Sequence, residues 1–251
     1  MDLTYIIYSH SSYSDILKIQ TDYIKNIKEK RILFIDKELD KLNNFDEIIT
    51  YDNKLTYSER IYTCLQKIKI TTKYILFTHE NNIIIKKEND KISNLLTILT
   101  NNNIDRLDLC CYKYINFDDN INFDDYILVK SLGNSLSGTQ IYNVGLAIYK
   151  NGILEKIMRN KKYNYREIEG SWDIEEYCRK EIKCYYINYK ENNFKLNCGY
   201  FHLSNIFLYL HITHNNNLLS KKNNLYPFMK NEYIKILKHY QIKRKFNPPM
   251  S

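Results

Sequence analysis

The chain contains little glycine and little proline. Only 6 glycines and 3 prolines occur among 251 residues. Glycine-rich loops that hold phosphates need several glycines at fixed spacing, and the sequence has neither a P-loop nor a G-x-G-x-x-G pattern. This scarcity excludes the two commonest glycine-based nucleotide motifs. A phosphate site in this protein would have to be built from strand ends and side chains.

The sequence also lacks paired cysteines and long apolar runs. None of its 6 cysteines forms a C-x-x-C pair, which argues against a zinc finger and against a disulfide framework. No run approaches the roughly 18 apolar residues of a membrane span. The N-terminus begins directly with a strand-like segment, without the basic region and apolar stretch of a signal peptide. We therefore expect no membrane span and a cytoplasmic protein, in the host cytoplasm if the source is a virus.

The net charge is positive but dispersed. Lysine and arginine number 37 against 29 acidic residues, a formal charge of +8. The lysines are spread along the whole chain and mingle with acids, so the charge forms no basic stripe of the kind that binds nucleic acid. A basic nucleic-acid-associated protein is therefore the weakest of the functional alternatives. Hydrophobic residues make up 44%, which is enough to build a core.

Strand-like and helix-like segments alternate in the N-terminal half. Apolar, β-branched runs are separated by segments whose apolar residues recur at helical spacing. The expected strands are 4–8, 31–35, 45–50, 74–78 and 107–114. This order predicts an α/β fold with a Rossmann-type, mostly parallel sheet and helices on both faces. We expect one domain over 1–200, with helices at 152–160 and 166–180, and a C-terminal helical extension over 201–251.

The segment Tyr74 to Ile85 is the most informative. A buried strand ends there on three polar residues, His79, Glu80 and Asn81, before a second apolar run begins. Ligands of open α/β sheets collect beyond the carboxyl ends of the strands. A carboxylate in that position can hold a divalent cation, which in turn can hold a diphosphate. The alternative interpretation is a polar turn between two strands.

Other polar residues follow the remaining predicted strands and are candidates for binding a nucleotide. They are Tyr8, Ser9, His10, Asp36, Tyr51, Asp52 and Arg60. A flat ring such as Tyr51 can stack on a base, and Arg60 can reach a phosphate. Two plainer interpretations stay open: Ser9 to Asp15 as helix-capping residues only, and Arg60 as one partner of a surface ion pair only.

Three segments, in this order, carry a family resemblance. They are Tyr51-Asp52 with Tyr57 and Arg60, then Tyr74-Ile-Leu-Phe-Thr-His-Glu-Asn, and then Tyr142 to Ile157 followed by Asn164 to Glu169. Together they resemble GT-A type nucleotide-sugar glycosyltransferases, in particular the small enzymes of bacterial surface-glycan clusters and large DNA viruses. The resemblance covers most of residues 1–180.

The resemblance implies a GT-A-like fold and the transfer of a sugar from a nucleotide-diphosphate donor, UDP-linked, to a hydroxyl of a glycan or glycoconjugate. It also implies Mn²⁺ or Mg²⁺ held by Glu80 and Asn81, with His202 as a further ligand. The family usually carries Asp where this chain has Asn81. An amide oxygen brings no charge, so metal affinity should fall. The alternative is therefore a catalytically inactive relative kept for binding.

The resemblance further implies an acidic residue near the reacting carbon. Glu169 is the first candidate for the base, with Glu167 and Asp173 as alternatives, while Glu80 would face the leaving diphosphate. A continuous helix would place Glu169 and Asp173 on one face. Trp172, the only tryptophan, would either pack on a sugar ring or belong to the core.

Overall fold

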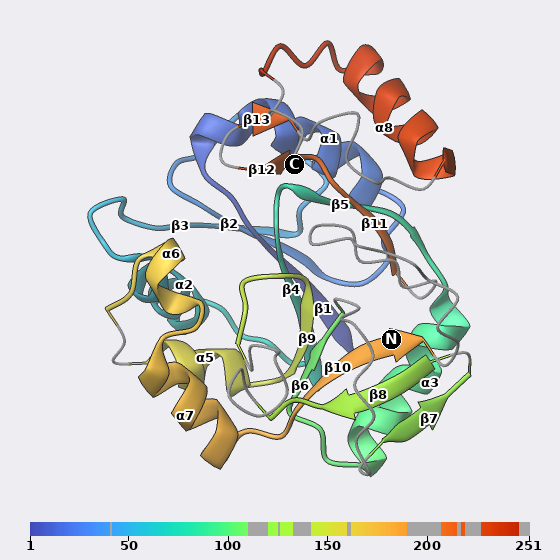
Figure 1. Cartoon of the computed structure of the whole chain (residues 1–251). Coiled ribbons are helices and arrows are strands. Elements are labelled where there is room, and N and C mark those ends of the chain that lie inside the picture. The colour runs from blue at the N-terminus through green and yellow to red at the C-terminus, as the bar shows by residue number, and fades with distance from the viewer. Residues whose placement is uncertain are drawn as a thin grey trace.

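A nine-stranded mixed sheet runs through the molecule (Figure 1). The computed structural model describes residues 1–40, 42–109, 120–124, 126–132, 142–159, 162–189, 207–214, 217–218 and 227–245. The strand order is β3-β2-β1-β4-β9-β6-β10-β8-β7. The strands are β1 Leu3–Tyr8, β2 Arg31–Ile35, β3 Glu47–Thr50, β4 Tyr74–His79, β6 Arg106–Asp108, β7 Ile121–Phe123, β8 Tyr126–Lys130, β9 Ala147–Lys150 and β10 Cys184–Tyr189.

The first four strands of this sheet are parallel, as predicted. β1 pairs in parallel with β2 and with β4, and β2 pairs in parallel with β3. Tyr8 lies opposite both Phe34 and His79, so the carboxyl ends of these strands meet at one edge. β9 is antiparallel to β4 and to β6, which makes β6 run in the direction of β4. The predicted α/β class with a Rossmann-like, mostly parallel sheet is thus confirmed.

Helices cover both faces of the sheet. They are α1 Ser14–Ile24, preceded by the 3-10 turn η1 Ser11–Tyr13, then α2 Tyr57–Gln66, α3 Asn89–Asn101, α5 Ile153–Met158, α6 Tyr165–Ile168, α7 Trp172–Glu181 and α8 Pro227–His239. Apolar residues of α1 and α3 share one buried core, and those of α2, α5 and α7 share the other. All six residues of β1 are buried, because helices and loops cover both faces of this central strand.

The C-terminal segment packs against α1 and combines a helix with strands. β5 Asn82–Lys87 leaves the main sheet and pairs antiparallel with β11 Phe207–His211, and β12 Thr213–His214 pairs with β13 Asn217–Leu218. A separate apolar cluster joins α1, β5, β11 and α8, and Figure 1 shows α8 beside α1 at one end of the molecule. The predicted helical extension therefore includes β strands that the sequence pattern did not separate.

Two local predictions were wrong, and an alternative left open for Trp172 is decided. The helix expected over 166–180 is two helices, because Glu169 has an extended backbone and Gly170 a φ of 71°, which favours glycine. Glu169 and Asp173 therefore do not share a helix face. Trp172 is 68% exposed and is not part of the core. The strand expected over 107–114 ends at Asp108 among the described residues.

No helix in the described part of the chain is long and apolar enough to cross a membrane.

Candidate functional site

The carboxyl edge of the parallel strands brings several of the predicted residues together. The backbone amide of Ser9 donates to Phe34 O at 2.8 Å, and that of Glu80 donates to Tyr8 O at 3.1 Å. The hydroxyl of Tyr51 donates to Ser9 O at 2.7 Å. Residues that follow β1, β3 and β4 are thus fastened to one another, at the place where such sheets bind ligands.

An aromatic wall lines this edge. The rings of Tyr8 and Tyr51 stack, with centroids 5.2 Å apart and planes 4° from parallel. The Tyr57 hydroxyl lies 2.9 Å from Nε2 of His79. The Tyr165 ring packs edge-on against the rings of Tyr57 and His79. Burial lowers the pKa of His79 to about 4, against a backbone hydrogen bond with Val144 that raises it. His79 is therefore neutral near pH 7 and serves the wall as a hydrogen-bonding ring.

Asp36 is fixed from three sides. Its carboxylate accepts from the Ser11 amide at 2.5 Å, from the Ser11 hydroxyl at 2.7 Å and from Asn53 Nδ2 at 3.0 Å. His10 Nε2 lies 3.5 Å away. Burial raises the pKa of Asp36, but these hydrogen bonds and His10 outweigh it, so the pKa is lowered and the group is an anion. Asp36 thus ties the turn after β1 to the loop after β3.

Arg60 holds the loop that follows Tyr51. Its Nε donates to Leu55 O at 2.8 Å, and one terminal nitrogen donates to Asn53 O at 2.5 Å. The guanidinium lies 5.3 Å from the Tyr51 ring centroid. In that same loop the exposed Asp52 accepts from the Lys54 amide at 2.9 Å. Arg60 therefore anchors a loop beside the site. Tyr51 is 4% exposed and stacks against Tyr8, which is 7% exposed.

Glu80 is a buried carboxyl with an unusual proton affinity. It is 6% exposed and shares a hydrogen bond with the Ser9 side chain. Burial raises the pKa of Glu80 to about 7, although Ser9 and Arg244 act in the opposite direction. Glu80 also raises the pKa of Tyr13 and of Tyr165, so its charge reaches both phenols. A carboxyl near half-ionisation at neutral pH is typical of an acid–base or ligand-binding site.

Glu80 gives the stability of the protein a pH dependence of defined sign. Folding raises its pKa from 4.5 to about 7, so this stabilisation is complete below the unfolded-state pKa and is lost as the pH rises through about 7. In EDTA, we expect the wild type to lose about 3 kcal/mol relative to Glu80→Gln between about pH 4 and about pH 8. Urea unfolding of both proteins at the two pH values measures this change. A difference that does not vary with pH would contradict it.

Asn81 offers one oxygen that fits a metal ligand. Its Nδ2 donates to Thr213 O at 3.3 Å, while its Oδ1 is buried and has no hydrogen-bond partner among the described residues. That oxygen and the Glu80 carboxyl are the donor types that Mg²⁺ and Mn²⁺ accept, with water and substrate phosphates completing the shell. Among the described residues, no three or more histidine, cysteine, aspartate or glutamate side chains are grouped so that they could hold a metal ion. His202 lies outside the described residues.

Among the three candidate bases, Glu169 is the one tied to the site. It follows α6 and accepts from the Val144 amide at 2.7 Å. Burial and the nearby Asp108 raise its pKa, against the Val144 hydrogen bond and Arg106. Tyr165 lies near both carboxyls, because Glu169 and Glu80 each raise the pKa of its phenol.

The other two candidates have structural partners. Glu167 accepts from the Asn164 amide at 2.9 Å and so caps α6. Asp173 lies on the exposed side of α7 and accepts from the Tyr163 hydroxyl at 2.5 Å.

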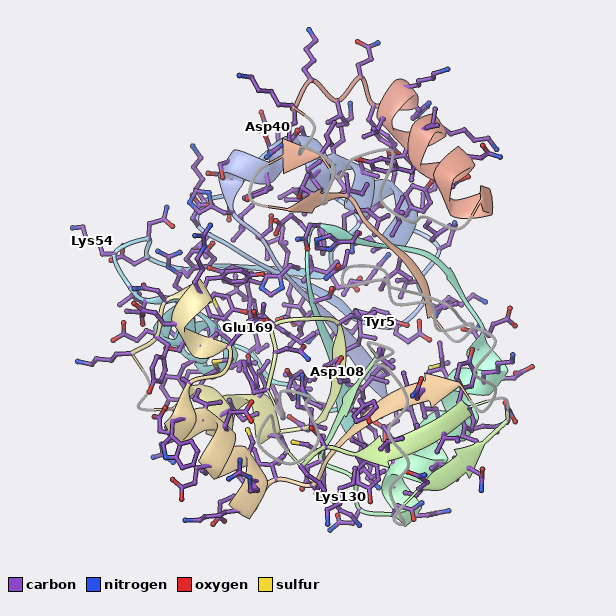
Figure 2. All side chains as sticks on the ribbon, viewed as in Figure 1. Tyr5, Asp40, Lys54, Asp108, Lys130 and Glu169 are labelled. Atoms are coloured by element: carbon purple, nitrogen blue, oxygen red, sulfur yellow. The ribbon has the colours of Figure 1, made fainter. Side chains whose placement is uncertain are left out.

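A buried polar cluster supports Glu169 and was not predicted. Arg106, 1% exposed, donates to Tyr149 Oη at 3.2 Å and to Asn143 O at 3.3 Å, and lies 3.6 Å from the Asp108 carboxylate. Asn143 also donates to Asp108. Figure 2 shows Asp108 and Glu169 near the middle of the molecule. The cluster anchors the loop whose Val144 contacts Glu169. The only signal of this cluster in the sequence was a charged residue at each end of β6.

No protein-family model and no curated protein matches the sequence. Among solved structures, two with partial structural similarity are each 13% identical to this chain. One is the 4-diphosphocytidyl-2C-methyl-D-erythritol synthase of Anaerococcus prevotii, with a TM-score of 0.43 over 78% of this chain and 93% of that one. The other is the bifunctional IspDF of Campylobacter jejuni, with a TM-score of 0.34 over 64% of this chain and 44% of that one.

These similarities are too low to bear on activity. The chain also spans less than half of the Campylobacter protein. What the strand order establishes is the fold: a mixed, mostly parallel α/β sheet of Rossmann-like type, with helices on both faces.

Proposed function

We propose that this protein is a glycosyltransferase that moves a sugar from a nucleotide-diphosphate donor, UDP-linked, to a hydroxyl of a glycan or glycoconjugate acceptor. One observation carries the proposal. Two carboxyls of raised pKa, the buried Glu80 and the partly buried Glu169, both act on the Tyr165 phenol near the carboxyl edge of the sheet. Paired acids with perturbed pKa values in such a position are typical of catalytic sites.

The donor side of the proposed site follows β1, β2 and β3. There the Tyr8–Tyr51 stack, Ser9 and the anchored Asp36 form a rigid surface, itself largely buried, beside which the nucleoside would lie. His10, Asp52 and Arg60 lie next to these residues, held by the contacts described above. A rigid surface of this kind binds without losing much conformational entropy.

Glu169 is the proposed base. It takes the proton of the acceptor hydroxyl as that oxygen bonds to the anomeric carbon and the bond between carbon and diphosphate oxygen breaks. Glu80 faces the leaving diphosphate. A Mn²⁺ or Mg²⁺ held by Glu80 and Asn81 Oδ1 would supply positive charge for that leaving group.

Two measurements test the proposal. Saturating UDP should raise the melting temperature, because a ligand at about 100 times its Kd adds about 2.7 kcal/mol of stability. Hydrolysis of UDP-sugars, assayed with and without Mn²⁺, should show turnover. Absence of both responses would contradict the proposal, and tight salt-sensitive DNA binding in their place would favour a nucleic-acid-associated protein.

A catalytically inactive binding relative is the second candidate. It is favoured by Asn81, whose amide nitrogen is engaged by Thr213 O and whose oxygen brings no charge to a metal. This candidate predicts stabilisation by UDP without turnover of any UDP-sugar, in the presence or absence of Mn²⁺.

A further inference from the structure

Arg244, close to the C-terminal end of the described residues, reaches back to the turn after β1. Its Nε donates to Asp15 Oδ2 at 2.7 Å, and one terminal nitrogen donates to Asp15 Oδ1 at 2.6 Å and to Ser12 O at 2.8 Å. The guanidinium carbon also lies 4.6 Å from the ring centroid of Tyr13. Two parallel hydrogen bonds to one carboxylate fix the orientation as well as the distance of the two groups. The start of α1 is thus held by a residue 229 positions after Asp15.

The segment that carries this arginine is itself fixed to the rest of the protein. The carbonyl of Lys245 accepts from the Leu218 amide at 2.7 Å. The hydroxyl of Tyr240 donates to Asp22 Oδ2 of α1, also at 2.7 Å. Residues 240–245, here called the C-terminal clasp, are therefore anchored on both sides of the arginine. The clasp can hold the turn because it is held in its own place.

The turn that the C-terminal clasp holds is also the turn that holds Asp36. Ser11 donates to the Asp36 carboxylate through its amide and its hydroxyl. Ser12, the next residue, accepts from Arg244 through its carbonyl. Hydrogen bonds within a 3-10 turn such as Ser11–Tyr13 are poorly aligned, so contacts from outside help to fix its position. Asp36 and Arg244 therefore grip one short turn from two sides.

A surface ion pair without further effect is the plainer explanation of the Arg244 contacts. Exposed pairs of that kind are worth little, since water competes for both groups. The Arg244 side chain, however, is only 16% exposed and bonds to a backbone carbonyl in addition to the carboxylate. Its charge also acts on the Glu80 carboxyl, which places the guanidinium within electrostatic reach of the proposed diphosphate side. The contact therefore lies beside the proposed site.

We propose that Arg244 is a positioning residue for the nucleotide, which it serves by holding the Ser11–Tyr13 turn against Asp36. The inference rests on the proposed transferase function. Without the arginine, Asp36 keeps its place after β2 but its contacts with Ser11 loosen, so the nucleoside meets a less ordered surface. Such a change lowers the affinity for the donor and leaves the chemical step unaltered.

Isothermal titration of the full-length protein with UDP tests this role. Arg244→Met keeps the length of the side chain but removes its hydrogen bonds, and Asp15→Asn weakens the same contact from the other side. We expect each variant to raise the Kd for UDP about tenfold, which corresponds to about 1.4 kcal/mol. The double variant should bind no more weakly than Arg244→Met, because both changes break one contact. With a UDP-sugar as substrate, KM should rise by the same factor while kcat stays within about twofold of the wild type.

The matched control is Lys243→Met, which removes the exposed neighbouring cation and should bind UDP like the wild type. Wild-type affinity in Arg244→Met or in Asp15→Asn would overturn the positioning role, and so would additive losses in the double variant. A lower melting temperature with an unchanged Kd would show a purely structural contact and would refute it too. If the wild type itself binds no UDP, the transferase proposal fails as well. If the wild type and all variants bind UDP equally, only the positioning role fails.

Discussion

Replacing Glu80 by glutamine is expected to lower the rate of sugar transfer by about a hundredfold or more, the usual effect of removing a group that stabilises a leaving anion. Glutamine has the same shape and can still bond to Ser9, but it can neither ionise nor exchange a proton. The fold should therefore persist while metal-stimulated turnover disappears. Steady-state kinetics of UDP-sugar hydrolysis, with Mn²⁺ varied, measure the loss.

The matched control for this variant is Glu38→Gln. It makes the same chemical change at an exposed position after β2. Its activity should equal that of the wild type. If Glu80→Gln keeps full activity and metal response, Glu80 has no part in the mechanism.

Replacing Arg106 by methionine is expected to cost about 3–5 kcal/mol of folding stability, because it leaves the buried Asp108 carboxylate without its guanidinium. Asp108 is 2% exposed and accepts from Asn143, a neutral donor that cannot balance a buried charge. Urea unfolding at neutral pH measures this loss of stability.

Arg31→Met is the matched control for Arg106→Met. Arg31 also begins a strand and pairs with an aspartate, Asp46, but at the surface. Its loss should cost less than about 1 kcal/mol. The double variant Arg106→Met with Asp108→Leu should be more stable than Arg106→Met alone, since no buried charge remains unpaired. Equal losses for Arg31→Met and Arg106→Met would refute the buried-pair argument.

Local patterns in the sequence determined the main elements and the edge that carries the site. Apolar runs of strand length predicted β1, β2, β3 and β4, and the alternation with helices predicted their parallel pairing. Polar residues after those strands then had to meet at one edge, because parallel strands bring their carboxyl ends together. Glu80, Ser9 and Asp36 were found in this way.

Tertiary structure alone decided how those residues behave. The pKa of Glu80 is raised because the folded chain buries its carboxyl. Asp15 and Arg244, which are distant from Glu80 in the sequence, also act on this pKa. The pairing of β5 with β11 joins residues 120 or more positions apart, and the Arg106 cluster joins β6 to a loop 37 positions later. Gly170, with a positive φ, separates two helices that the pattern had joined into one. A sequence pattern reports on neighbours along the chain, whereas burial, proton affinity and long-range pairing depend on which distant segments come into contact.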